Sequence, residues 1–340
     1  MCSNRELLMS MIDKLEIRVP RATPYRQEFA TLYRELAWED AHRSTQGLRR
    51  RLRPSRYYTS VVDLREFGHD AILHGFATHG KNGDHKIELL ETGKMTLARM
   101  AHEVERIFDT DPQNLSVMRV DLTADVPDIP VAWFLTHCRV QYKRWTADFG
   151  QIADAPEYSE MGMRVVQTVY FGKRPNVFRF YDKVAESLSR YKQLLRHANP
   201  DAEPPAFEEI YGYSQHAVLT RVERQMAAGR VPTPVDTVRK LRNSKAFNPF
   251  DRLKIVSSSE YAQKPQSPRR DVYERGMQVQ ELIKGQGLHR ARYALNEQSR
   301  GNADRILQTL EAFIPDEGYH LTPEELYQRY QESVSRQLVA

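Results

Sequence analysis

The sequence is poor in the residues that build disulfide frameworks and zinc clusters. Its 340 residues contain two cysteines, Cys2 and Cys138, which are too few for a disulfide scaffold or a four-cysteine zinc site. No apolar run approaches the roughly 20 residues of a membrane span. The run Leu7–Ile12 is too short for a secretory signal. We therefore expect a protein of a reducing cytosol with no membrane partner.

Several catalytic motifs are also missing. The sequence has no H-E-x-x-H motif, and no H-x-H pair falls on an expected strand. The segment 93–96 resembles the end of a phosphate loop, but Glu88 stands where that pattern needs glycine. These absences argue against a zinc hydrolase and against an ATPase. The histidines near the expected hairpins are then surface or structural residues: His69, His74, His79 and His85.

What is present is an ordinary globular composition with a mild basic excess. Hydrophobic residues make up 40% of the chain and charged residues 28%, which argues against global disorder. The formal net charge of +5 favours a polyanionic partner without proving one.

Three expected strands each combine an apolar face with a polar face. In 116–126, Val120 and Leu122 alternate with Asp121 and Thr123, and the same alternation recurs in 177–181 and 219–226. Strands of this kind form antiparallel sheets with one face on a core. We predict an α+β fold with a central antiparallel sheet, helices packed on one face, and a small helical C-terminal region.

The chain divides by pattern near residue 230. Strand signals end there, and helical spacing dominates residues 231–340. The last expected helix, 323–337, opens with a capping box, Thr322 and Glu325. A linker rich in serine, proline and glutamine is expected near 257–270. We therefore predict a catalytic α+β domain over 1–230 and a helical region over 231–340.

Tyr181 is the strongest candidate for chemistry. It lies on the strand face opposite Phe178 and Phe180, beside Arg179. Lys183, two residues on, can share that face. A phenol near fixed cations can attack a phosphodiester once it is activated, and an arginine can hold a phosphate by two hydrogen bonds. The alternative is a half-buried strand tyrosine of purely structural role.

Carboxylates on the neighbouring strands suggest a metal. Asp121, Glu186 and Glu223 carry the hard oxygen ligands that Mg²⁺ or Mn²⁺ prefers. Asp125 shares a face with Asp121, but residues four apart on a strand lie roughly 13 Å apart, so both are not expected in one site. The alternative is solvated carboxylates paired with Arg119 and Arg221.

A basic segment is the expected DNA contact. Residues 47–58 hold five arginines and end in two tyrosines, a combination that suits phosphates and unpaired bases. The alternative is a solvated charged connector. The residues expected to contact DNA are Arg49, Arg50, Arg51, Arg53 and Arg56, with Lys173 and Arg174 at a hairpin tip.

Taken together, the ordered motifs resemble the rolling-circle replication initiators of filamentous phages and plasmids, of the gene II protein and replication initiation factor type. The resemblance covers roughly residues 11–230. It is carried by Met11–Leu15 with Arg18 and Pro20, Arg119–Leu122, Thr168–Arg174, Phe178–Lys183 with Glu186, and Arg221–Glu223.

The resemblance implies a function. Tyr181 would nick origin DNA and become linked to the 5′ phosphate, assisted by Lys183, with Asp121, Glu186 and Glu223 as an acidic metal site. Tyr191 is the nearest candidate for a second tyrosine. Origin DNA, single-stranded or extruded as a hairpin, is the expected substrate, and a host helicase and single-strand-binding protein are the expected partners. Two rivals stay open: a non-catalytic DNA-binding replication regulator, and a metal-dependent nuclease that uses water.

Overall fold

The structure is a computed structural model that describes most of the chain. It describes residues 11–42, 56–77, 83–140, 145–151, 164–173, 175–197, 204–227, 229–255 and 319–339. Within these ranges the fold is α+β and is built on an antiparallel sheet, as the sequence predicts. No helix in these ranges is long and apolar enough to cross a membrane.

The main sheet runs in the order β2-β3-β4-β1-β5-β10-β9-β8-β7. Its middle strands, β5, β10 and β9, are the three whose alternation was clear in the sequence. The strand bounds are β1 Ile12–Val19, β2 Tyr58–Asp63, β3 Ala71–Ala77, β4 His85–Leu89, β5 Ser116–Pro127, β7 Trp145–Gln151, β8 Arg164–Lys173, β9 Asn176–Asp182 and β10 Leu219–Ala227. A two-stranded sheet that the sequence did not predict pairs β6 (Cys138–Val140) with β11 (Leu253–Ile255).

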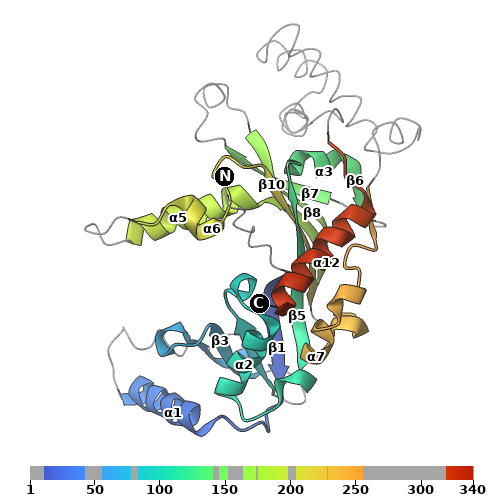
Figure 1. Ribbon diagram of the computed structural model, residues 1–340. Coiled ribbons are helices and arrows are strands. Elements are labelled where there is room, and N and C mark those ends of the chain that lie inside the picture. The colour runs from blue at the N-terminus through green and yellow to red at the C-terminus, as the bar shows by residue number, and fades with distance from the viewer. Residues whose placement is uncertain are drawn as a thin grey trace, which may run out of the picture.

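Helices lie on both sides of the sheet around β5 and β10. In Figure 1, α3 and α12 lie on one side of these strands, and α5 and α6 project from the other. The helices predicted on the apolar face are therefore confirmed. Two further helices, α5 and α6, lie on the other side of the sheet, where the sequence did not predict them. The helix bounds are α1 Gln27–His42, α2 Leu97–Ile107, α3 Val131–His137, α5 Lys183–His197, α6 Phe207–Tyr211, α7 Val238–Leu241 and α12 Pro323–Val339. Short 3-10 turns are η2 Arg65–Phe67, η3 Thr92–Lys94, η4 Pro112–Asn114, η5 Thr233–Val235 and η6 Ser244–Ala246.

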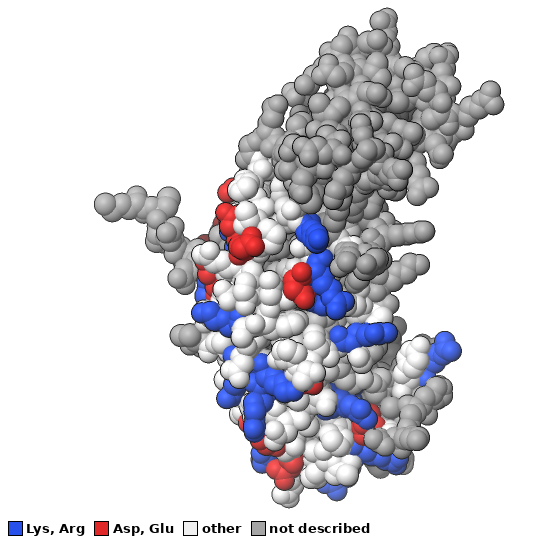
Figure 2. Space-filling model, turned by 90° about the vertical axis from the view of Figure 1, so that its right-hand side faces the viewer, with Lys and Arg blue, Asp and Glu red and all other residues white. Residues whose placement is uncertain are grey.

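The apolar core forms where the alternating strands meet the helices. Val120, Leu122, Phe180 and Val222 are fully buried and belong to one hydrophobic cluster with side chains of α2, α3 and α12. The side of the molecule with α7 and α12 carries Lys and Arg mainly over its lower part, mixed with acidic groups (Figure 2).

The segment after β10 is tied to the sheet by a buried arginine. Arg224 points to the apolar face, where its guanidinium lies 5.3 Å from the Phe178 ring centroid. It donates to the Pro249 carbonyl at 2.7 Å and to Asp251 Oδ1 at 3.0 Å. An arginine in a core needs such partners, because an unpaired buried charge is strongly unfavourable.

The described part of the C-terminal region packs into the same core. Leu326, Tyr330 and Val334 of α12 are fully buried and share the hydrophobic cluster of β5. The predicted capping box is confirmed: Thr322 N donates to Glu325 Oε2 at 2.7 Å, and Glu325 N donates to Thr322 Oγ1 at 3.1 Å. The domain boundary near 230 stays a prediction, but the described residues beyond it complete the core of the sheet. The expected linker near 257–270, and the part of the expected helical region from 271 to 318, lie outside the described residues.

Gln337 near the end of α12 joins three segments that are distant in sequence. Its Oε1 accepts from Met11 N and Ile12 N, both at 3.0 Å. Its Nε2 donates to the carbonyls of Thr92 and Met95 at 2.8 and 2.9 Å. The last described helix therefore holds the start of β1 against η3.

Replacing Gln337 tests this role. We expect Gln337→Met to lower the free energy of unfolding by about 2 to 3 kcal/mol, because an unsatisfied buried backbone group costs about 1–3 kcal/mol. The measurement is urea unfolding followed by circular dichroism. The control is Gln331→Met on the exposed side of α12, where one bond to the Lys245 carbonyl is lost and a change below about 0.5 kcal/mol is expected. Equal effects of the two variants would contradict the role of Gln337.

Candidate functional site

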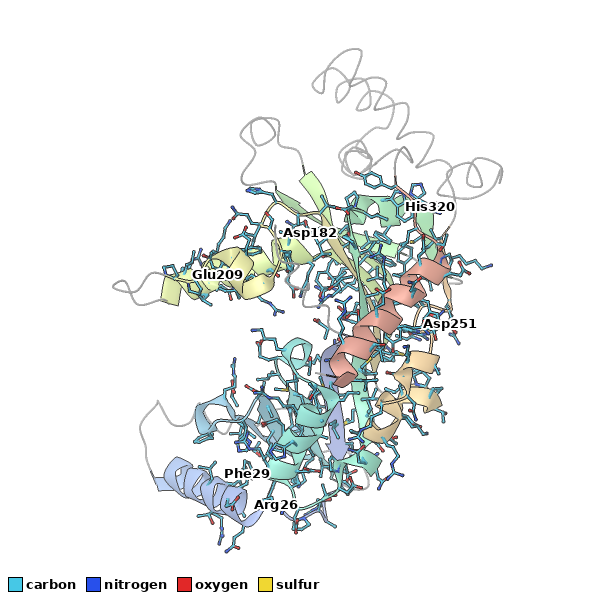
Figure 3. All side chains as sticks on the ribbon, in the orientation of Figure 1. Arg26, Phe29, Asp182, Glu209, Asp251 and His320 are labelled. Carbon is cyan, nitrogen blue, oxygen red and sulfur yellow. The ribbon has the colours of Figure 1, made fainter. Side chains whose placement is uncertain are left out.

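The junction between β9 and α5 places Tyr181 and Lys183. Asp182 ends β9, and its Oδ1 accepts from Ala185 N at 2.9 Å, so it caps the helix that starts at Lys183. Figure 3 shows Asp182 at this junction. The expectation that Lys183 shares the strand face of Tyr181 is therefore wrong, because the cap turns the chain into a helix. Lys183 Nζ nevertheless lies 5.7 Å from the Tyr181 ring centroid.

Tyr181 is buried among charges rather than in the hydrophobic core. Only 2% of the residue is exposed, and its hydroxyl has no hydrogen-bond partner among the described residues. The Arg179 guanidinium stacks on its ring, 3.9 Å from the centroid. Burial, and then the charge of Asp13, raise the pKa of the Tyr181 phenol well above its ordinary value. The phenol is therefore neutral in this state, and its oxygen makes no hydrogen bond to the described residues.

Asp121 and Glu223 form a pair of like-charged groups beside the tyrosine. Both are buried, on the adjacent strands β5 and β10. Arg119 binds Asp121 through Nε at 2.9 Å, while Gln225 Nε2 donates to Glu223 Oε1 at 2.6 Å. Burial, and then the charge of Asp121, raise the pKa of Glu223 to about 8. Burial raises the pKa of Asp121 as well. At neutral pH the pair therefore keeps a proton on Glu223, because two buried carboxylates this close do not both ionise readily.

Glu186 lies with cations rather than with this pair. It accepts from Lys183 Nζ at 2.6 Å and from Arg190 at 2.8 Å, one helical turn away in each direction. Burial alone would raise the pKa of Glu186, but the charges of Lys183 and Arg190 hold it below its ordinary value. Its part in the site is to fix the lysine near Tyr181.

Asp13 completes the group, and sequence reasoning gave it no role. The register between β1 and β5 shifts between Ile12 and Lys14, so Asp13 is the extra residue of a β-bulge. Its Oδ1 accepts from Arg221 at 2.8 Å, and its carbonyl accepts from Thr92 Oγ1 at 2.7 Å. Burial would raise the pKa of Asp13, but the charges of Arg221 and Lys183 hold it below its ordinary value. A single sequence does not show a β-bulge. The only available signal for Asp13 was its acidic side chain near the start of an expected strand.

Arg221 links the two sides of the group. It is paired in register with Tyr181 across β9 and β10. Its Nε and second amino group bind the two oxygens of Asp125 at 2.6 and 2.7 Å. The ion pairs of the alternative interpretation are thus present: Asp121 with Arg119, and Asp125 with Arg221. They are not solvated, because both carboxylates and Arg221 are buried and Arg119 is half-buried. We call the set Asp13, Asp121, Arg179, Tyr181, Lys183, Glu186, Arg221 and Glu223 the polar cluster.

The predicted metal ligands are only partly brought together. Among the residues that the structure describes, no three His, Cys, Asp or Glu side chains converge to hold a metal ion. Asp121 and Glu223 do interact, and a divalent cation would relieve the repulsion that raises the pKa of Glu223. Mg²⁺ is commonly held by one or two carboxylates together with substrate phosphate oxygens. The pair fits such an ion, whereas the pairing of Glu186 with Lys183 and Arg190 does not.

The other predicted residues lie away from the cluster or outside the described ranges. The Tyr191 hydroxyl donates to the Pro205 carbonyl at 3.0 Å, and its ring packs edge-on against Phe207. Arg56 is exposed, with its guanidinium 5.8 Å from the Tyr57 ring centroid, and Lys173 ends β8. Arg49, Arg50, Arg51, Arg53 and Arg174 lie outside the described residues, so their expected role stays a prediction.

The carboxylate pair predicts an unusual pH dependence. The folded chain keeps a proton on Glu223 that the unfolded chain releases above its ordinary pKa of 4.5. The free energy of unfolding should therefore fall as pH rises from about 4.5 to about 8, by at most about 1.4 kcal/mol per pH unit for one proton. Urea unfolding across this range, in buffer free of divalent cations, measures the slope.

Two variants separate this effect from other groups. Glu223→Gln should reduce the decrease in the free energy of unfolding between pH 4.5 and pH 8. Glu88→Gln should leave it in place, because the contact with His74 and the hydrogen bond and charge of Lys14 lower the pKa of Glu88 to about 2, so that this group loses its stabilisation only at lower pH. A slope that Glu223→Gln does not change would contradict the assignment.

Comparison with known proteins does not identify a family for this chain. No protein-family model matches the chain, and no curated protein matches it in sequence. The fold and the site define an α+β protein with a buried cluster of acids, cations and one tyrosine.

Proposed function

We propose that this chain is a metal-dependent, sequence-specific DNA nicking and joining enzyme that initiates rolling-circle replication through a covalent 5′-phosphotyrosine. The observation that carries the proposal is the Tyr181 hydroxyl. It is buried and has no hydrogen-bond partner among the described residues, and the cationic groups of Arg179 and Lys183 lie 3.9 and 5.7 Å from the centroid of its ring. A buried polar atom without a partner is unfavourable and calls for an explanation. A role as the nucleophile explains the missing partner, because the oxygen must be free to attack a phosphorus atom.

The residues of the cluster can supply the parts of a transesterification. The Tyr181 oxygen attacks the phosphorus, a new O–P bond forms, and the bond from phosphorus to the 3′ oxygen breaks. The phenol proton passes to a carboxylate of the cluster once substrate binding brings one within reach, and Asp13, which is ionised and whose charge acts most strongly on Tyr181, is the candidate. Lys183, whose pKa burial lowers, gives a proton to the leaving 3′ oxygen. The phosphodiester energy stays in the tyrosine ester, so the reverse step rejoins the strand without ATP.

Charge stabilisation is the second contribution of the cluster. Arg179 is placed to bind a phosphate oxygen in exchange for its 3.4 Å contact with Glu223. Asp121 and Glu223 would hold a Mg²⁺ or Mn²⁺ ion, which polarises the scissile phosphate when bound. Glu186 keeps Lys183 in position through its 2.6 Å hydrogen bond.

The closed state of the cluster favours a second candidate, the non-catalytic DNA-binding regulator. With 2% of Tyr181 exposed, no phosphate reaches the hydroxyl unless the surrounding side chains move. A regulator would keep this arrangement as a structural element and bind origin DNA without cutting it. The nuclease that uses water is favoured by no observation of its own.

One assay separates these functions. The protein is incubated with end-labelled single-stranded oligonucleotides from its own replicon and with Mg²⁺, then denatured and run on a gel. We expect labelled DNA that migrates with the protein and is released by protease. Binding without cutting would indicate the regulator, and cutting without a protein adduct would indicate the nuclease. The proposal places the reaction in the bacterial cytoplasm, with a host helicase and single-strand-binding protein acting after the nick.

A further inference from the structure

A cleft of about 530 Å³ opens between the α5–α6 arm and the η3 turn. Asp13, Lys183 and Arg221 line it, so it reaches the polar cluster. In Figure 3, Glu209 marks the position of α6. The volume lies within the range of small-molecule pockets, roughly 300–1,000 Å³, which suits an unpaired nucleotide.

The charge of the lining suits phosphate. Six cationic side chains face three carboxylates. The cations are Lys14, Arg65, Lys94, Lys183, Arg190 and Arg221. Two of them lie near the rim in weak pairs: Lys94 with Glu91 at 3.0 Å and Arg190 with Glu186 at 2.8 Å, with 64% and 58% of the cationic side chains exposed. Exposed pairs of this kind contribute little to stability, so a phosphate can replace the carboxylate at low cost.

An aromatic wall faces these cations. Tyr211 and Tyr213 line the cleft at the end of α6. The Tyr211 ring lies 4.7 Å from that of Phe207, and the Tyr213 hydroxyl is 2.6 Å from Ser187 Oγ. Packing therefore holds both rings in place before any ligand binds. A fixed ring beside phosphate-binding cations is the arrangement that binds unpaired bases in a sequence-tolerant way.

We propose that this cleft binds the unpaired DNA strand next to the phosphate that Tyr181 attacks, with one base stacked on Tyr211 and the backbone phosphates on Lys94 and Arg190. This inference rests on the proposed function for the identity of the substrate. It assigns binding to residues that the sequence analysis did not select, and it does not depend on the arginine-rich segment 47–58.

The test measures binding without cutting. Fluorescence anisotropy follows a labelled oligothymidylate of about 15 nucleotides on full-length protein carrying Tyr181→Phe. We expect Tyr211→Ala to weaken binding about tenfold or more, since stacking on an aromatic ring is lost. Tyr211→Phe should bind as the parent does. Lys94→Ala should weaken binding and reduce the slope of log affinity against log salt by about 0.7.

Lys240→Ala is the matched control, because Lys240 is a partly exposed lysine paired with Asp236 at 2.8 Å and does not line the cleft. It should leave the affinity and the salt slope unchanged. The proposal is overturned if Tyr211→Ala and Lys94→Ala bind like the parent, if Lys240→Ala has the same effect as Lys94→Ala, or if a duplex of equal length binds more tightly than the single strand.

The outcomes also separate this inference from the proposed function. A tyrosine adduct together with unchanged binding by the cleft variants overturns the cleft and leaves the nicking activity standing. Binding that depends on Tyr211 and Lys94, in a protein whose parent never forms an adduct, supports the cleft and overturns the nicking activity.

Discussion

Tyr181→Phe is expected to abolish the covalent adduct while leaving the protein as stable as before. Removing a nucleophile lowers the rate of such a step by at least about a thousand-fold. The Tyr181 hydroxyl has no hydrogen-bond partner among the described residues. Deleting a buried polar atom without a partner removes a penalty rather than a bond, so the free energy of unfolding should stay equal or rise slightly. Gel detection of the adduct and urea unfolding of the same preparation measure both effects.

Tyr191→Phe is the matched control, since it also removes one phenol oxygen, from a tyrosine of α5 that lies away from the polar cluster. This hydroxyl donates to the Pro205 carbonyl, so the variant should lose about 0.5–1.5 kcal/mol and keep the first adduct. If Tyr191 acts as the second tyrosine, only the later joining step is lost. An adduct that persists in Tyr181→Phe would show that another group is the nucleophile. A loss of stability above about 1 kcal/mol would show that the hydroxyl has a partner.

Arg221→Met is expected to be the most destabilising single change in the polar cluster, at about 3–5 kcal/mol, and to remove activity as well. The guanidinium is buried and binds Asp125 through two bonds and Asp13 through a third. Removing one partner of a buried ion pair leaves an uncompensated charge, whereas removing both is often neutral. Urea unfolding at pH 7 measures the loss.

Two further variants sharpen this test. Arg65→Met breaks another two-bond pair, with Asp63, but both side chains are largely exposed, and a change below about 1 kcal/mol is expected. The double variant Arg221→Met with Asp125→Leu should recover at least half of the lost stability, because it removes the buried carboxylate that Arg221→Met alone leaves without a cation. If Asp125→Leu recovers nothing, the loss comes from packing rather than from charge.

The strands were readable from the sequence because their alternation follows directly from the pleat of a sheet. Val120, Leu122 and Val222 had to face a core, so their neighbours Asp121 and Glu223 had to face the other way. The capping box at Thr322 was equally local, and the structure confirms it. The placement of Lys183 was predicted wrongly, because nothing in the spacing showed that Asp182 would end the strand by capping a helix.

The bulge at Asp13 and the position of Glu186 could not be read in the same way. Asp13 faces Arg221 only because β1 gains a residue against β5, and that register depends on contacts with Thr92 and Gln337, far along the chain. Glu186 was expected near Asp121, but helical spacing gives it to Lys183 and Arg190 first. These partners are close in sequence, so they are always within reach of Glu186. A meeting of Glu186 with Asp121 would depend on how distant segments pack, which the sequence pattern does not show.

The sequence by itself determined the alternating strands and the face on which Asp121, Tyr181 and Glu223 lie, and it singled out Tyr181 as the candidate for chemistry. Tertiary structure decided that the polar face is closed rather than open to solvent, which acid meets which cation, and that α12 completes the core. The physical reason is that face and period depend on neighbours two to four residues away. Burial and charge pairing depend on segments that approach only when the whole chain has folded, as Gln337 approaches Met11.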